Sequence, residues 1–456
     1  MLAKRAPSST EVCPVTRAEI ETAGSRLALL CWLTLLAIAY ESLIPFQYRP
    51  VSLNDAIANF LHLRWEPLGP GDRGDWIGNI VLYLPLGFFL SGALGRRSRV
   101  VGFLFAAALG TVIAVGLEFA QTWASPRTVR LNDVVAEAIG AALGAGAWVF
   151  CGPALVRAVR EALRGGRTGL RAALLLYLVA YTFVALYPFD FAVNAAELRQ
   201  RLQGAEVLGA LPHDLFSVRA LVHLLLKAAL MIPLGVAIRI GWRGGALTAA
   251  VAAALFTSAI ECARWFELSA QVNAANVLLG AVGAVIGNRV AVLEWLSGER
   301  GLVLIRACAW ILLGPYVLVL ATARGWRPHV QDSATVNGVL QNLHWIPFYY
   351  TYYASKLAAF GSLMNVAASF VPVGTFMWAV RLRNADTAGH QRQVWQTALI
   401  AGLVAVCIEF GGLVTAGLRP DPTNVLIAIA AAVIAQRGCE WFARILLSVA
   451  GAESAA

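Results

Sequence analysis

Charged residues are scarce in this sequence. Only 14% of its 456 residues are Asp, Glu, Lys or Arg, whereas 59% are hydrophobic, and the mean hydropathy is +0.68. A soluble globular domain carries about 25% charged residues, so the composition excludes an ordinary soluble protein. The net charge of +10 does not indicate nucleic-acid binding, because the basic residues stand in short segments between apolar runs and form no basic face interleaved with aromatic residues.

Sequence patterns that hold metals, disulfides or common catalytic groups are also missing. The seven cysteines are scattered without a CxxC pair, so they predict neither a disulfide framework nor a metal site. There is no HExxH, no P-loop and no recognisable nucleophile motif. We therefore expect neither a metal nor a cofactor.

Long apolar runs, by contrast, fill most of the chain. About twelve runs of roughly 20 residues, enough to cross a hydrocarbon core about 30 Å thick, follow one another from Arg26 to the end. The sequence therefore predicts an all-α, polytopic membrane helix bundle with about twelve transmembrane helices. Their approximate centres are Leu35, Leu84, Ile113, Leu143, Val179, Leu230, Leu255, Val282, Leu312, Phe370, Leu403 and Ile429.

Arginine-rich loops give the predicted orientation. Arginine clusters follow the even-numbered runs, and the positive-inside rule puts such loops in the cytoplasm. Residues 1–25, which lack the apolar core of a signal peptide, and residues 437–456 are then cytoplasmic tails. Three long loops, about 47–75, 190–219 and 323–356, are predicted to lie outside.

One pattern occurs three times along the chain. A shift of 143 residues superposes Glu118 on Glu261, and a shift of 291 superposes it on Glu409, without a gap. Each copy also holds a Pro-Phe pair, which predicts the outer membrane boundary because proline stops a helix and an aromatic ring anchors at the interface. Four spans per copy is an even number, so the sequence predicts three parallel four-helix repeats. Their predicted boundaries are 26–152, 171–295 and 302–436.

Ionisable side chains inside a predicted span are costly and often functional. Glu118 is expected near the outer end of its span, facing the aqueous boundary, with Gln121 on the same face. On the preceding span Asp75 and Asn79 share a face in the same way. The candidate substrate-binding residues are Asp75, Asn79, Glu118, Gln121, Arg127, Asn132, Asp133 and, in the later copies, Glu261 and Glu409.

A purely structural interpretation of these residues stays open. Asp421, and the polar residues at the matching positions of the other copies, are well placed as helix N-caps. Glu118 and Arg127 are then a simple ion pair, as are Glu261 and Arg264, three residues apart. Only the first copy keeps the whole set, so the first copy is the one expected to bind a ligand.

The first copy resembles the VanZ-like family of bacterial membrane proteins. Glu137 departs from the pattern, since the family usually has Asn there, and the later copies lose the arginine position to Ala270 and Leu418. The resemblance rests on Asp75, Asn79, Pro85, Gly87, Glu118, Gln121, Arg127, Asp133, Gly140 and Gly144.

The resemblance implies work at the cell envelope, since the family takes its name from a protein linked to resistance against teicoplanin-type antibiotics. We expect a protein of the bacterial inner membrane that binds or handles a lipid-linked cell-wall or polysaccharide intermediate without catalysis. Its expected partners are membrane lipids, such an intermediate and envelope-assembly proteins. Two alternatives remain: an intramembrane enzyme with Glu118 or Asp133 as general acid or base, and a secondary transporter, although inverted repeats are missing.

Overall fold

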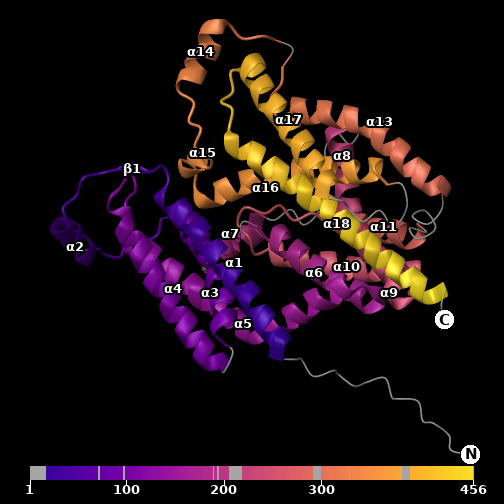
Figure 1. Ribbon diagram of the computed structural model, residues 1–456, viewed down its shortest axis with the longest axis horizontal. Coiled ribbons are helices and arrows are strands. Elements are labelled where there is room, and N and C mark those ends of the chain that lie inside the picture. Colours follow the sequence, from indigo (N-terminus) through magenta and orange to yellow (C-terminus); the bar gives the residue numbers. More distant parts are fainter. Residues whose placement is uncertain are drawn as a thin grey trace, which may run out of the picture. The chain divides into compact units, whose positions relative to one another are not determined.

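The computed structural model is built almost entirely from helices (Figure 1). The chain divides into two compact units. We call Met1–Gly69 with Gly78–Pro153 the N-terminal unit, and Pro70–Ile77 with Ala154–Ala456 the C-terminal unit. The structure describes residues 17–69, 72–95, 98–187, 189–192, 195–204, 218–290, 299–327, 329–382 and 391–454.

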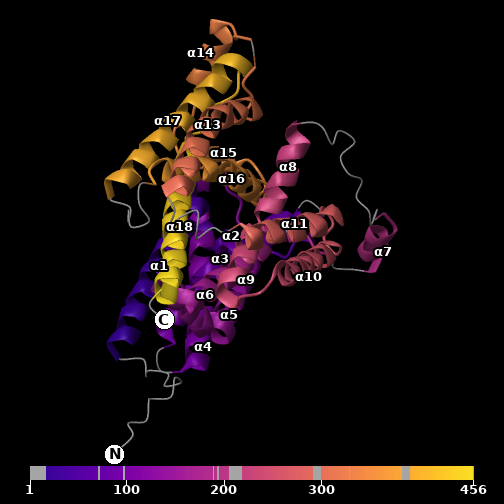
Figure 2. The same ribbon diagram turned by 90° about the vertical axis from the view of Figure 1, so that its right-hand side faces the viewer.

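Four long helices run side by side in the N-terminal unit (Figures 1 and 2). Their core holds buried residues from each helix, such as Ile38, Tyr83, Ala106 and Ala145. Two-residue strands β1 (Gln47–Tyr48) and β2 (Ala124–Ser125) pair antiparallel. The helices are α1 (Arg17–Leu43), short α2 (Leu53–Leu61), α3 (Asp72–Leu94) from Gly78 onward, α4 (Arg99–Gln121), and α5 (Leu131–Arg164) as far as Pro153.

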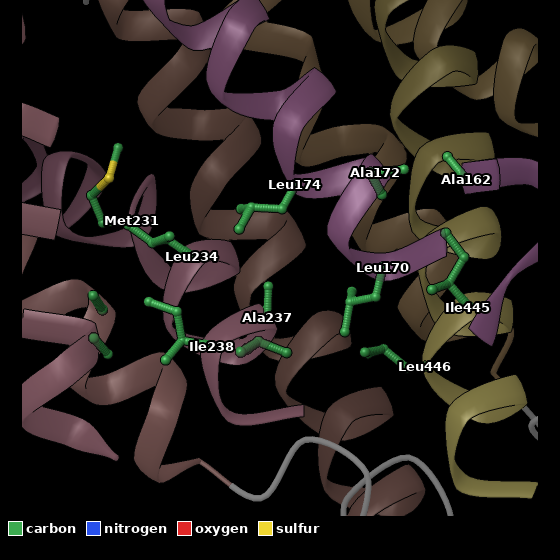
Figure 3. Packing of buried hydrophobic residues seen from close by; sticks show 14 of the residues in the cluster. Ala162, Leu170, Ala172, Leu174, Met231, Leu234, Ala237, Ile238, Ile445 and Leu446 are labelled. Atoms are coloured by element: carbon green, nitrogen blue, oxygen red, sulfur yellow. The ribbon is translucent and has the colours of Figure 1, made fainter. Parts of the chain in front are cut away.

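The C-terminal unit contains the remaining helices. Its largest apolar cluster joins α6, α9 and α18, and Figure 3 shows Leu170 and Leu174 of α6 between the side chains of α9 and those of α18. A second cluster joins α13, α16, α17 and α18. The helices are α6 (Gly166–Ala185), α7 (Ala195–Gly204), α8 (Val218–Ala229), α9 (Ile232–Trp242), α10 (Ala246–Arg264), α11 (Ala275–Arg289), α13 (Glu299–Ala323), α14 (Ser333–Gln341), α15 (Tyr349–Tyr352), α16 (Lys356–Val380), α17 (Gln391–Ala416) and α18 (Pro422–Ser454).

Eleven helical segments of the described chain are long and apolar enough to cross a membrane. Each contains one of the predicted centres, which confirms an all-α, multi-pass membrane protein. The remaining centre, Val282, lies in α11, which has only 15 residues and is therefore about 22 Å long at 1.5 Å per residue. The apolar run continues beyond α11, but Val290 has an extended backbone and ends the helix.

Helices also extend into the segments predicted as tails. Residues 1–16 lie outside the described part of the chain, and α1 begins at Arg17, before the predicted start of the first span. At the other end, α18 continues to Ser454. Its Leu446 is fully buried, and the Trp441 indole N–H donates to the Ala162 carbonyl over 3.2 Å. Apolar packing therefore keeps the predicted C-terminal tail helical.

The phenylalanine of each Pro-Phe pair adopts a left-handed backbone, with φ of 60° at Phe46 and 63° at both Phe189 and Phe348. The Phe46 N–H donates to the Leu43 carbonyl over 2.8 Å and closes the end of α1. Phe189 follows α6 in the same way, whereas Phe348 precedes the short helix α15. The middle pair is described only in part, because Pro188 lies outside the described residues.

Candidate functional site

Four helices of the N-terminal unit bring polar side chains together near one end of the helix bundle. We call this set the polar layer. Its buried members include Asn79, Glu118 and Glu137, which are only 1–2% exposed. By element, the polar layer consists of Glu41 from α1, Asn79 and Tyr83 from α3, Glu118 and Gln121 from α4, Arg127 from the loop before α5, and Asn132, Asp133 and Glu137 from α5.

Amides hold the start of α5 in place. The Asn79 side-chain amide donates to the Asp133 carboxylate over 2.8 Å and ties α3 to α5. The Asn132 amide donates to the Glu66 carbonyl over 2.7 Å, and the Glu66 N–H donates back to the Asn132 oxygen over 2.9 Å. Asn132 and Asp133 lie inside the first turn of α5, and these contacts tie that turn to α3 and to the loop before α3.

Asp421, by contrast, caps α18 as the sequence predicted. Its side chain accepts the Thr423 N–H over 2.8 Å.

Tyr83 stands at the centre of the acids. It is fully buried, and its phenol interacts electrostatically with Glu137, Glu118 and Glu41. These three carboxyl groups come from three different helices, so the packing of α1, α4 and α5 around α3 brings them together. Burying several acids in an apolar bundle is costly, so such a set of side chains is a candidate functional site.

Arg127 binds the end of α1. Its guanidinium donates to the Ile44 carbonyl over 3.0 Å and to the Glu41 carbonyl, and it lies 3.5 Å from the Glu41 carboxylate. A cation that donates to the last carbonyls of a helix satisfies them and complements the helix dipole. Arg127 therefore has a structural role at α1. The predicted pair between Glu261 and Arg264 is present, at 3.0 Å.

The sequence suggested that Glu118 faces the aqueous boundary. In the structure Glu118 is instead buried and only 2% exposed. The chain after α1, residues 47–51, which we call the strap, passes over the end of α4. The Arg49 N–H donates to the Trp123 carbonyl over 2.8 Å, and the Trp123 indole N–H donates to the Val51 carbonyl over 2.9 Å. Local periodicity cannot predict these contacts, because they join residues about 70 positions apart.

The hydrogen bond of the Asp75 side chain lies outside the polar layer. Residues 70–77 group with the C-terminal unit, where the Asp75 carboxylate accepts the Lys356 N–H over 2.7 Å at the start of α16. The sequence placed Asp75 beside Asn79 in one site, but its described hydrogen bond is to a different part of the chain.

Glu261 and Glu409 are satisfied by neighbouring groups. The Glu261 carboxylate accepts the Asn276 amide over 2.8 Å and the Asn273 N–H over 3.0 Å. The Glu409 carboxylate accepts the Asn424 amide and the Asp421 N–H, both over 2.9 Å. Each acid thus ties the end of one helix to the start of the next, which is a structural function.

Sequence reasoning missed two members of the polar layer, Glu41 and Tyr83, and treated Glu137 only as a departure from the family. Glu41 and Glu137 carried a usable signal, because both are acids within long apolar runs. Tyr83 carried none, since a tyrosine in an apolar run is also an ordinary core residue. In the part of the chain that the structure describes, no cluster of three or more His, Cys, Asp or Glu side chains could hold a metal ion.

Comparison with known proteins finds a family for the part of the chain that holds the polar layer. Residues 26–152 match the VanZ/LLP1 family, and Glu41, Tyr83, Glu118 and Glu137 all fall within the match. Neither the curated proteins nor the solved structures give a match. The resemblance seen in the sequence is thus confirmed for the first of the three predicted copies. This multi-pass membrane protein carries a VanZ/LLP1 domain at residues 26–152.

Proposed function

We propose that the VanZ/LLP1 domain binds the hydroxyl-bearing headgroup of a lipid-linked cell-wall or polysaccharide intermediate, without catalysis. The observation that carries this proposal is the polar layer, in which Glu118 and Glu137 are buried around Tyr83 while Asn79 donates to Asp133. Envelope-assembly proteins are the proposed partners. Tolerance of teicoplanin-type antibiotics is the proposed consequence for the cell.

The chemistry of the polar layer favours a sugar over a phosphate. Carboxylates accept hydrogen bonds and repel anions, and the one arginine, Arg127, already donates to the end of α1. Sugar hydroxyl groups are donors that several carboxylates can bind at once. We therefore propose that the saccharide enters the polar layer and that the phosphate of the carrier stays outside it.

We further propose that residues 171–295 and 302–436 are diverged copies of residues 26–152, in parallel orientation. One supporting observation is the shared pattern around Glu261 and Glu409, each bonded to an asparagine 15 residues later. A second is helix packing: a Cβ on Gly87, Gly235 or Gly374 would lie 1.9–2.0 Å from the carbonyl oxygen of Ala141, Ala284 or Ala432, respectively. The three alanines are separated by the same shifts of 143 and 291 residues.

The proposed location is the bacterial inner membrane, with both termini in the cytoplasm and the polar layer toward the outer leaflet. The arginine clusters that follow even-numbered spans support this orientation. The polar layer then lies at the level where an externally oriented headgroup of a lipid-linked saccharide is found.

Thermal unfolding of the purified full chain tests the binding proposal. We expect a polyprenyl-linked disaccharide to raise the Tm, since a single site at a hundredfold excess over Kd adds about 2.7 kcal/mol, which is several degrees. The same polyprenyl phosphate without sugar should not. Glu118→Gln, which keeps the side-chain volume but removes the charge, should abolish the shift.

Glu409→Gln is the matched control, because Glu409 is a satisfied acid outside the polar layer. It should retain the ligand-induced shift. A shift of equal size with and without the sugar would contradict the headgroup assignment. A shift that survives in both Glu118→Gln and Glu137→Gln would contradict the polar layer as the site.

A further inference from the structure

The short helix α2 exposes an apolar stripe outside the membrane-spanning helices. Leu53, Ile57 and Leu61 are spaced by four residues and so share one face, and they are 59%, 42% and 76% exposed. The helix is well formed, because the Ser52 side chain accepts the Asp55 N–H over 3.2 Å at its start. Three exposed aliphatic side chains on one face of nine residues form an apolar patch, and such patches mark protein or membrane contact sites.

A second face of α2 fixes the level at which the helix lies. Ala56 is fully buried, and the Phe60 ring packs edge-on against Phe119, with ring centroids 5.3 Å apart. Phe119 belongs to the last turn of α4, within the candidate span Arg99–Gln121. A helix that packs beside that turn is level with the end of the candidate span, where the boundary between lipid and water is expected.

The remaining arc of α2 is polar or small. Asn54, Asp55, Ala58 and Asn59 are all exposed, and Asp55 and Asn59 lie opposite the stripe on a helical wheel. Figure 1 shows α2 to the side of one end of α4, away from the body of the four long helices.

We propose that α2 is an interfacial helix that inserts Leu53, Ile57 and Leu61 among the acyl chains of the adjacent lipid leaflet. Helices of this kind bury their apolar face about 5–10 Å into the boundary between headgroups and chains. The occupant is the bilayer itself, because α2 packs on the last turn of α4, a candidate membrane span whose Val112 and Phe105 are 65% exposed. This inference does not depend on the headgroup proposal.

Fluorescence in liposomes tests the insertion. In the full chain with its seven native cysteines replaced, Ile57→Cys or Leu61→Cys is labelled with an environment-sensitive nitrobenzoxadiazole dye. The protein is reconstituted into phosphatidylcholine vesicles that contain a lipid spin-labelled at acyl position 5. We expect a blue-shifted emission at both positions and severalfold stronger quenching than for the control Asn59→Cys, which lies on the opposite, polar side of α2.

Three outcomes would overturn the proposal. Equal quenching at Ile57 and Asn59 would mean that α2 does not lie with its stripe in lipid. A dye emission typical of water at both stripe positions would mean that the stripe lies in solvent. A blue-shifted dye that spin-labelled lipid cannot quench would mean that protein covers the stripe. Agreement between Ile57→Cys and Leu61→Cys guards against local misfolding in either variant.

Discussion

Single acidic residues of this protein differ sharply in how they are stabilised. Glu261 and Glu409 accept several hydrogen bonds, whereas Glu267, in the loop after α10, is fully buried and neither of its oxygens has a hydrogen-bond partner. Burial raises the pKa of Glu267 to about 7, with Arg264 opposing the shift and Asp190 adding to it. This carboxyl group of the C-terminal unit therefore binds and releases its proton near neutral pH.

The raised pKa of Glu267 predicts that the free energy of unfolding depends on pH. The folded chain holds the proton up to about pH 7, while the unfolded chain releases it near 4.5, so the free energy of unfolding should fall as the pH rises between these values. We expect a loss on the order of 1–3 kcal/mol in total. Thermal unfolding from pH 4.5 to 8 should show this decline in the wild type and lose most of it in Glu267→Gln.

The exposed Glu66 provides the control, since its side chain is 64% exposed. Glu66→Gln should keep the pH dependence of the wild type. If the Tm of Glu267→Gln and of the wild type declined in parallel over this pH range, the buried proton would be ruled out as the cause.

Part of the polar layer could be predicted residue by residue. Asn79, Glu118 and Asp133 were recognisable, because polar groups inside apolar runs are costly and conspicuous. The burial of Glu118 was not recognisable, since it depends on how α4 packs against the other helices, whereas Glu41, an acid within an apolar run, was recognisable but missed. Contacts between distant segments leave no periodic trace in the sequence.

At the scale of helices, glycine determines how closely α3 and α5 approach. A Cβ on Gly87 would lie 1.9 Å from the Ala141 carbonyl oxygen, and one on Gly144 would lie 2.0 Å from that of Leu84. Backbone cannot yield as a flexible side chain can, so the helices would have to move apart. The spacing of Gly140 and Gly144 predicts such close packing, and the structure shows it, but the apolar run around Val282 overestimated the length of α11.

Gly87→Ala should therefore destabilise the N-terminal unit by about 1–3 kcal/mol, the usual cost of overpacking. Gly116→Ala is the matched control in α4, because a Cβ there meets nothing within 4 Å. It should be neutral or stabilising by up to about 1 kcal/mol, since alanine is the better helix former. Comparing the Tm of the two variants in the same detergent measures the difference, and equal effects would contradict the packing argument.

For the whole molecule, the orientation depends on whether α11 crosses the membrane. With twelve crossings both termini lie on one side, and with eleven they lie on opposite sides. We expect α11 to cross although it is short, because it packs along both α9 and α10 and approaches its neighbours closely at Gly283 and Gly287. A hydrophobic mismatch of a few ångströms costs only fractions of a kcal/mol per ångström.

Single cysteines on a cysteine-free background distinguish the two arrangements with a membrane-impermeant thiol reagent in intact cells. Arg64→Cys, after α2, and Asp332→Cys, before α14, should react equally if α11 crosses, whereas Arg99→Cys, at the start of α4, should be shielded until the membrane is opened. If α11 does not cross, Asp332→Cys will be shielded together with Arg99→Cys. Glu409 would then lie at the opposite membrane surface from Glu118, and copies in parallel orientation would be impossible, because a parallel repeat must enter the bilayer from the same side each time.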